Sequence, residues 1–168
     1  MSQFDKAKET AERQEELLQF DQFNNETAWE LGKLCVEEIK RRGIDMAVCI
    51  RKINGNIIFQ YQTEGTTINN QCWMRRKFNS VIYYESSSLL ATINANISGE
   101  TLTDCGLSKS DYVLCGGGFP IRIKGSGIYM VLTVSNLPHE QDHAFIVDVL
   151  SKFLGVEAPQ IEGEIPTV

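Results

Sequence analysis

Three stretches of the chain combine residue types that could bind a ligand or a metal ion. The first, His139-Glu140-Gln141-Asp142-His143, matches the H-E-x-x-H spacing. On a helix this spacing sets two imidazoles one turn apart, where they can share a zinc ion, with the glutamate as a base. Pro138 places the motif in the first helical turn, and the chain has no third histidine. The alternative is that Glu140 and Asp142 complement the helix dipole while His143 makes a local hydrogen bond.

The second stretch is the triple glycine Gly116-Gly117-Gly118, which precedes Phe119-Pro120. Glycine permits backbone conformations that are closed to other residues, so this loop could offer N–H groups to an anion or let a flat ligand approach the main chain. The loop lacks the lysine and the helix start of a P-loop. A sharp turn into the following strand explains the glycines equally well.

The third stretch, Trp73-Met74-Arg75-Arg76-Lys77, gathers three cations and an aromatic ring within two helical turns. The planar guanidinium of Arg75 or Arg76 could clamp a carboxylate or a phosphate. The charge pattern alone favours a solvated face or an ion-pair network between subunits. No serine, cysteine or threonine stands in a G-x-S-x-G or similar nucleophile elbow, so covalent catalysis has no support in the sequence.

These stretches must be positioned by helices and strands that the hydrophobic periodicity predicts. Helical spacing indicates five helices, at about residues 5–18, 25–42, 69–84, 86–96 and 138–154. Strand-like runs at 46–51 and 57–61 flank Asn54-Gly55, and runs at 121–124 and 128–134 flank Gly125-Ser126-Gly127, which indicates two hairpins. Neither hairpin needs a parallel crossover. The sequence therefore predicts an α+β fold with an antiparallel sheet and flanking helices.

Length and composition limit the number of domains and the kinds of partner. The chain has 168 residues, of which 42% are hydrophobic, which suits a single domain with its own core. The formal charge is −6 and no basic run is longer than Arg75-Arg76-Lys77, so neither nucleic acid nor an anionic membrane is expected as a partner. Residues 1–18 hold no apolar run typical of a signal peptide or a membrane span, so we expect a cytoplasmic location. The five cysteines show no C-x-x-C pair and are interpreted as free thiols.

We divide the chain into an N-terminal helical extension (1–19), an α+β domain (20–155) and a C-terminal tail (156–168). The apolar stripe of the extension is too thin for a helix that is stable alone in water, so this helix should rest on another surface. A neighbouring subunit could provide that surface. The tail contains Pro159 and Pro166 and is predicted to be extended or disordered.

Taken in order, several of these stretches resemble the haem-degrading-domain family that includes GlcG and HbpS, in its short, uncharacterised branch. The similarity runs from about Phe20 to Leu154. The residues that carry it are 45–51, 73–77, 112, 116–121 and 131–143. The resemblance implies a profilin-like fold, a homo-oligomer, and binding of haem or another small ligand. Asn136 stands where the family usually has glycine, and His139 where glutamine is common, which weakens the zinc interpretation.

Our leading hypothesis is a cytoplasmic, homo-oligomeric protein that binds a small anionic ligand. The predicted site consists of Arg75, Arg76, Lys77, Gly116, Gly117, Gly118, Phe119, Asp142 and His143. If the ligand is haem, His143 would be the axial ligand and Arg75 or Arg76 would meet the propionates. One alternative is a scaffold protein in which Arg76 or Lys77 pairs with Asp142 at a subunit interface, without a pocket. Another is a zinc hydrolase that uses His139-Glu140-x-x-His143.

Overall fold

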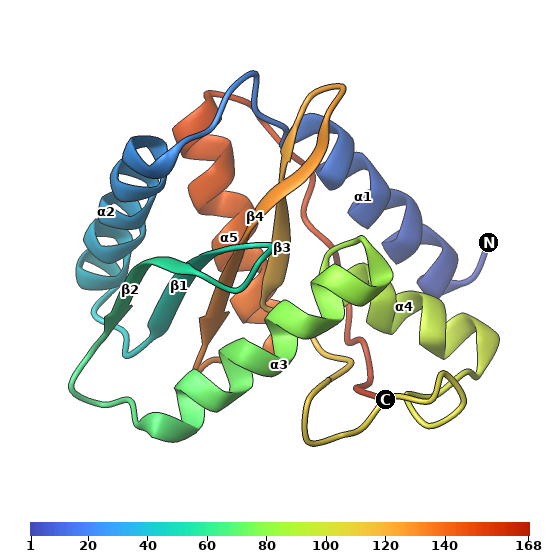
Figure 1. Cartoon of the computed structure of the whole chain (residues 1–168). Coiled ribbons are helices and arrows are strands. Elements are labelled where there is room, and N and C mark those ends of the chain that lie inside the picture. The colour runs from blue at the N-terminus through green and yellow to red at the C-terminus, as the bar shows by residue number, and fades with distance from the viewer.

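The computed structural model describes residues 1–168 as five helices and four strands (Figure 1). The helices are α1 (Gln3–Leu17), α2 (Asn25–Arg42), α3 (Ile68–Tyr84), α4 (Ser88–Ser98) and α5 (His139–Leu154). The strands are β1 (Ala47–Lys52), β2 (Ile57–Gln62), β3 (Gly118–Ile123) and β4 (Gly127–Ser135). This order of helices and hairpins is the predicted one, and the α+β class is confirmed.

The four strands form one antiparallel sheet with the order β2-β1-β4-β3. Each hairpin supplies two neighbouring strands, and the pairing of β1 with β4 joins the hairpins, with Val48 opposite Val134. The last residues of β4 therefore lie in the middle of the sheet, next to the start of β3. Gly118, the first residue of β3, pairs there with Thr133.

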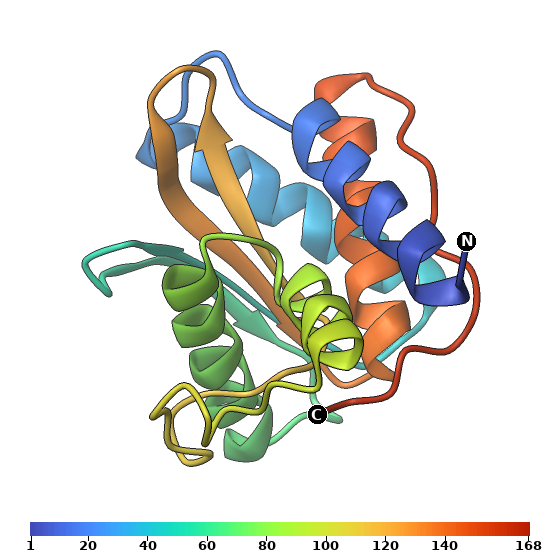
Figure 2. The same ribbon diagram turned by 90° about the vertical axis from the view of Figure 1, so that its right-hand side faces the viewer.

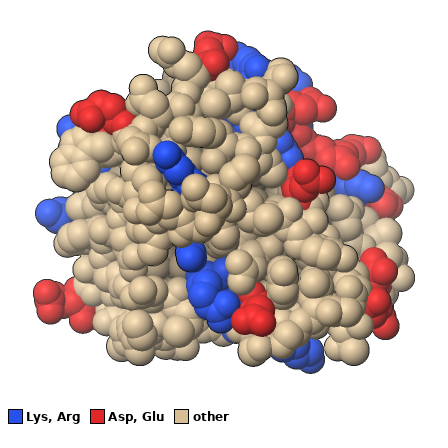
Figure 3. Space-filling model, viewed as in Figure 1, with Lys and Arg blue, Asp and Glu red and all other residues tan.

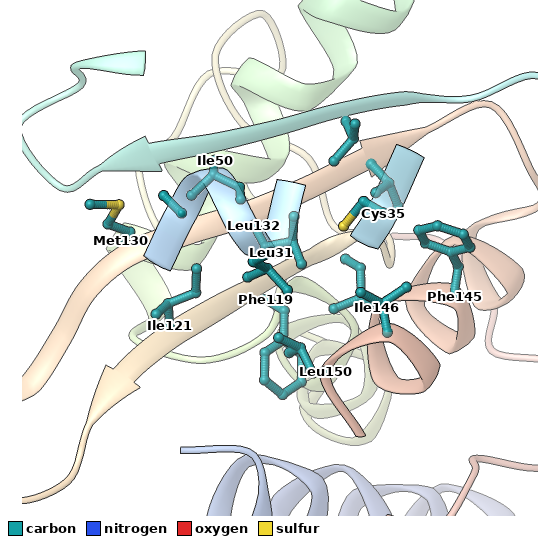
Figure 4. Packing of buried hydrophobic residues seen from close by; sticks show 14 of the residues in the cluster. Leu31, Cys35, Ile50, Phe119, Ile121, Met130, Leu132, Phe145, Ile146 and Leu150 are labelled. Atoms are coloured by element: carbon teal, nitrogen blue, oxygen red, sulfur yellow. The ribbon is translucent and has the colours of Figure 1, made fainter. Parts of the chain in front are cut away.

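Both faces of the sheet are covered by helices (Figures 1 and 2). Side chains alternate along each strand, so Val48 and Ile50 join the main core beneath α2 and α5, whereas Ala47 and Cys49 lie against α3. Figure 4 shows the main core, in which Leu31 of α2 and Ile146 of α5 approach strand residues such as Ile50, Phe119 and Leu132. Burial of apolar surface on both faces makes this a central sheet between two helical layers.

Cap residues set where the helices begin and end. Asn24 caps α2 through a capping box, and Gly43 ends that helix in the left-handed conformation, as its sequence predicts. Thr67 caps α3, and Ser87 caps α4, which continues to Ser98. Pro138 is the N-cap of α5 rather than a residue of its first turn, a difference of one position from the prediction.

The N-terminal helix and the C-terminal tail both pack on the domain. Ala7 and Ala11 of α1 are buried against Leu89, Leu90 and Ile93 of α4, so the extension rests on a helix of its own chain. Residues 156–168 form no helix or strand, and they run from α5 past α1 toward α4 (Figure 2). The domain boundaries at residues 20 and 155 remain predictions. No helix of the structure is both long enough and apolar enough to span a bilayer.

Candidate functional site

A buried ion pair joins α3 to the first turn of α5. The Lys77 ammonium lies 3.0 Å from Asp142 Oδ2 and donates a second hydrogen bond, of 2.8 Å, to the carbonyl of Val134. The Leu137 N–H donates to Asp142 Oδ1 at 3.1 Å. Burial raises the pKa of the Asp142 carboxyl, and the Lys77 ammonium opposes that rise. Only 3% of the Lys77 side chain and 2% of the Asp142 side chain are exposed, so the two charges compensate each other inside the protein.

The triple glycine lets the ion pair and two helices approach the main chain. Gly117 has φ +115°, and a Cβ at this position would lie 2.5 Å from Lys77 Nζ and 2.9 Å from the Val134 carbonyl. The N–H groups of Gly116 and Gly118 donate to His139 Nδ1 and Ser88 Oγ, both at 2.9 Å. These two N–H groups therefore have protein partners, and the structure supports the turn into β3 rather than an anion cradle.

A pocket of about 510 Å³ adjoins the Lys77–Asp142 pair. We call it the α3–α5 pocket, because α3 and the start of α5 form two of its walls, together with the loops before β3 and after β4 and the end of the chain. Its lining includes Asn69, Asn70, Trp73, Lys77, Val113, Leu114, Cys115, Ser135, Asn136, Leu137, His139, Asp142, Thr167 and Val168. A larger hollow of about 780 Å³ lies between α1 and the tail, but it is lined mostly by polar residues and contains none of the predicted site residues.

The pocket wall carries polar groups that the sequence analysis did not select. The Asn70 amide donates to Ser135 Oγ and to Asn136 Oδ1, each at 3.3 Å. Asn136 has φ +140°, a conformation that favours glycine, and its amide donates to the Asp45 carbonyl at 3.0 Å. This backbone conformation explains why glycine suits the position. Helical spacing could have identified Asn70 as a pocket residue, because residues 70, 73 and 77 recur at i, i+3 and i+7 and so share one face of α3.

The two predicted arginines reach the loop before β3 instead of Asp142. Arg75 lies 3.1 Å from Asp111 Oδ1 and donates to the Ser110 carbonyl at 2.8 Å. Arg76 donates to the Tyr112 carbonyl at 3.3 Å, and its guanidinium lies 4.5 Å from the Trp73 ring centroid. Figure 3 shows basic atoms grouped over α3 with acidic atoms beside them. Arg76 thus contacts Trp73, which lines the pocket, but does not line the pocket itself. Arg75 takes part in a surface ion pair with Asp111.

His143 and Phe119 lie outside the pocket lining. His143 Nε2 is 2.7 Å from Gln14 Oε1, and its Nδ1 is buried without a hydrogen-bond partner. Burial lowers the pKa of this imidazole to about 3, with a smaller contribution from His139. The Phe119 ring is part of the main core, 5.9 Å from the imidazole. The structure therefore brings Lys77, Gly117 and Asp142 together, and it places His143 behind them under α1.

The H-E-x-x-H match does not form a metal-binding group. His139 Nδ1 accepts from the Gly116 N–H, and its Nε2 lies 2.7 Å from the Ile165 carbonyl. His143 contacts Gln14 instead. No three His, Cys, Asp or Glu side chains are arranged to hold a metal ion. The geometry gives the zinc hydrolase alternative no support.

Comparison with known proteins gives the family. Residues 23–151 match the family described as haem degrading protein HbpS-like. The chain belongs to this HbpS-like family. It is 38% identical to a UPF0303 protein of Yersinia enterocolitica over 152 aligned residues. This alignment covers 90% of each of the two chains.

Two solved structures show the same HbpS-like fold. The Ybr137w protein has a TM-score of 0.81 and 23% identity, covering 88% of this chain and 87% of the other. The structure described as a PduOC:heme complex has a TM-score of 0.57 and 14% identity, covering 79% and 95%. At these identities the likeness concerns the fold.

Proposed function

We propose that this HbpS-like chain binds a small ligand with a carboxylate or similar anionic oxygen in the α3–α5 pocket. The observation that carries the proposal is the hydrogen bonding of Lys77. Two of its three N–H groups are used by Val134 and Asp142, and the third has no acceptor within the protein. A buried ammonium group with one unused donor on a pocket wall is suited to an anionic oxygen.

The rest of the wall supports a flat or partly apolar ligand. Trp73 offers an aromatic surface to the pocket, and the Arg76 guanidinium lies over its ring at 4.5 Å from the centroid. Val113, Leu114 and Leu137 supply apolar contacts. A volume of about 510 Å³ lies within the range of small-molecule sites, which combine apolar walls with a few placed polar groups.

Haem is the ligand that the family description suggests, and a neighbour in fold is described as a haem complex. The two histidines of this chain do not fit axial ligation as they stand. Both ring nitrogens of His139 have protein partners, and His143 is buried beneath Gln14. Support for haem is therefore limited to its anionic propionates, and we derive no iron ligand from this structure.

The scaffold alternative assumes that a Lys77–Asp142 pair lies between subunits and that no pocket is needed. The pair lies within one chain and borders a pocket, which favours the binding function. A homo-oligomeric state and a cytoplasmic location remain parts of the proposal.

The fluorescence of Trp73 can report on ligand binding in the pocket. Trp73 lines the pocket and Trp29 is exposed at a distance from it, so a Trp29→Phe variant isolates the fluorescence of Trp73. We expect a saturable change on titration with benzoate or haemin, and a weaker affinity in the Asn70→Ala variant. Asn79→Ala, on the same helix but outside the pocket lining, should bind as the parent does. Equal responses from all variants, or no saturable response to either compound, would contradict the proposal.

A further inference from the structure

We propose that residues 159–168 form a strap that closes the α3–α5 pocket, and that His139 and Glu140 are its clasp. This inference rests on the proposed function, because it assigns regulation to the same pocket. It also gives a role to the His139-Glu140 pair, which the binding function leaves unused.

The clasp holds the backbone of a single strap residue, Ile165. The Ile165 N–H donates to Glu140 Oε1 at 3.0 Å, and the Ile165 carbonyl lies 2.7 Å from His139 Nε2. Because the Gly116 N–H donates to His139 Nδ1 at 2.9 Å, the ring proton belongs on Nε2, which donates to Ile165. One neutral imidazole thus links the strap to the glycine loop beside Lys77.

The Ile165 side chain is the apolar anchor of the strap. It is 1% exposed and packs with Ala7, Ala11 and three residues of α4. Strap carbonyls also accept hydrogen bonds from side chains, at Glu164 from Gln3 (3.1 Å), at Pro159 from Gln14 (2.7 Å) and at Pro166 from Asn96 (2.8 Å). The Gln160 side chain donates to Asp148 Oδ1 at 2.7 Å. The strap forms no helix and pairs with no strand, so it can open locally while the rest of the domain stays folded.

The anchored strap directs its last residues over the pocket. Thr167 and Val168 line the pocket together with Cys115, and the Val168 N–H donates to the Leu114 carbonyl at 3.4 Å. Cys115 is a free thiol that is only 4% exposed. Its exposure to reagents in solution therefore reports on whether this part of the pocket is covered.

Alkylation of the full-length protein by N-ethylmaleimide, followed by peptide mass spectrometry, measures this opening without any ligand. We expect Ile165→Ala to raise the labelling rate of Cys115 by about tenfold or more, as expected for the loss of a buried aliphatic anchor. Glu140→Ala should raise the rate in the same direction and leaves the apolar cluster intact. Ile82→Ala, the same substitution at a partly buried residue of a different cluster, should leave the Cys115 rate near that of the parent.

Cys35, fully buried in the main core, distinguishes strap opening from unfolding. Faster labelling of Cys115 in the strap variants while Cys35 stays unlabelled supports local opening of the strap. Parallel labelling of both thiols, or a Cys115 rate unchanged in both strap variants, would overturn it.

The labelling assay also separates the strap from the proposed ligand. Benzoate should slow Cys115 labelling if it occupies the pocket. A rate that responds to Ile165→Ala but not to benzoate would retain the strap and count against the carboxylate site.

Discussion

At the scale of single residues, the sequence motif and the structure assign different chemistry to His143. The motif suggests a metal or haem ligand, whereas the structure buries the neutral imidazole and gives its Nε2 a partner in Gln14 of α1. An imidazole held neutral in this way links the stability of the fold to pH.

We predict that acidification destabilises the protein partly through His143. Its folded pKa of about 3 lies below the ordinary value of 6.5, so between these values the unfolded chain binds a proton that the folded chain does not. Stability is then complete above pH 6.5 and falls toward pH 3, by at most about 5 kcal/mol. Urea unfolding of the parent and of His143→Gln across this range should show a shallower pH dependence in the variant. Parallel curves would refute this assignment.

Gly117 is the second residue whose role is set by geometry. We predict that Gly117→Ala costs about 2–4 kcal/mol of unfolding free energy, from its positive φ and from the collision with Lys77 Nζ. Gly125→Ala is the matched control, since Gly125 also has a positive φ but nothing lies within 4 Å of the added Cβ. That variant should cost about 1–2 kcal/mol. Equal losses in chemical denaturation would show that the close approach to Lys77 is unimportant.

At the scale of elements, the Lys77–Asp142 ion pair connects α3 with α5 beside the end of β4, one of the two central strands. These helices cover opposite faces of the sheet, so the pair links the two helical layers directly. A buried pair of this kind is costly to break on one side but can be replaced by apolar residues.

We predict that Lys77→Met costs about 3–5 kcal/mol, because it leaves the Asp142 carboxylate buried without its partner. The double variant Lys77→Met/Asp142→Leu should recover most of this loss and yet fail to bind benzoate or haemin. Thermal unfolding and the Trp73 titration measure the two effects separately. If the double variant binds as tightly as the parent, Lys77 does not take part in ligand binding.

At the scale of the whole molecule, α1 and the tail are integrated into the domain that they flank. Glu15 of α1 lies 2.6 Å from Arg122 of β3 and accepts from the Ser87 N–H. Burial raises the pKa of the Glu15 carboxyl, against the opposing effect of Arg122. Together with Gln14, this residue connects α1 to β3, α4 and α5.

We predict that deletion of residues 1–19 lowers the melting temperature by roughly 10 °C or more, since several kcal/mol of packing are lost in a chain of this size. The deletion would uncover Leu89, Leu90 and Ile93, and it would remove Gln14, the partner of His143, and Glu15, the carboxylate partner of Arg122. Light scattering on the full chain tests the predicted homo-oligomer, and the truncated chain shows whether α1 contributes to it. An unchanged melting temperature would show that the α1 contacts add nothing to stability.

The α+β class, the order of the helices and hairpins, and the family could all be predicted from the sequence. These properties depend on local periodicity, capping residues and turn dipeptides such as Asn54-Gly55, which act over a few neighbouring residues. Of the predicted site residues, Lys77 in the middle of α3, Gly117 just before β3 and Asp142 in the first turn of α5 lie close together, and their role in binding stays a prediction.

Which polar residues face the pocket depends on the packing of helices and strands and could not be predicted from the sequence. Arg75 and Arg76 neighbour Lys77 in the sequence, but the helix turns about 100° per residue and directs them to the loop at 110–112. His143 follows Asp142 directly, yet it points to α1, while His139 contacts a strap residue from the far end of the chain. These contacts join residues 26 to 129 positions apart in the chain, and they leave no local pattern because they arise from the packing of whole elements.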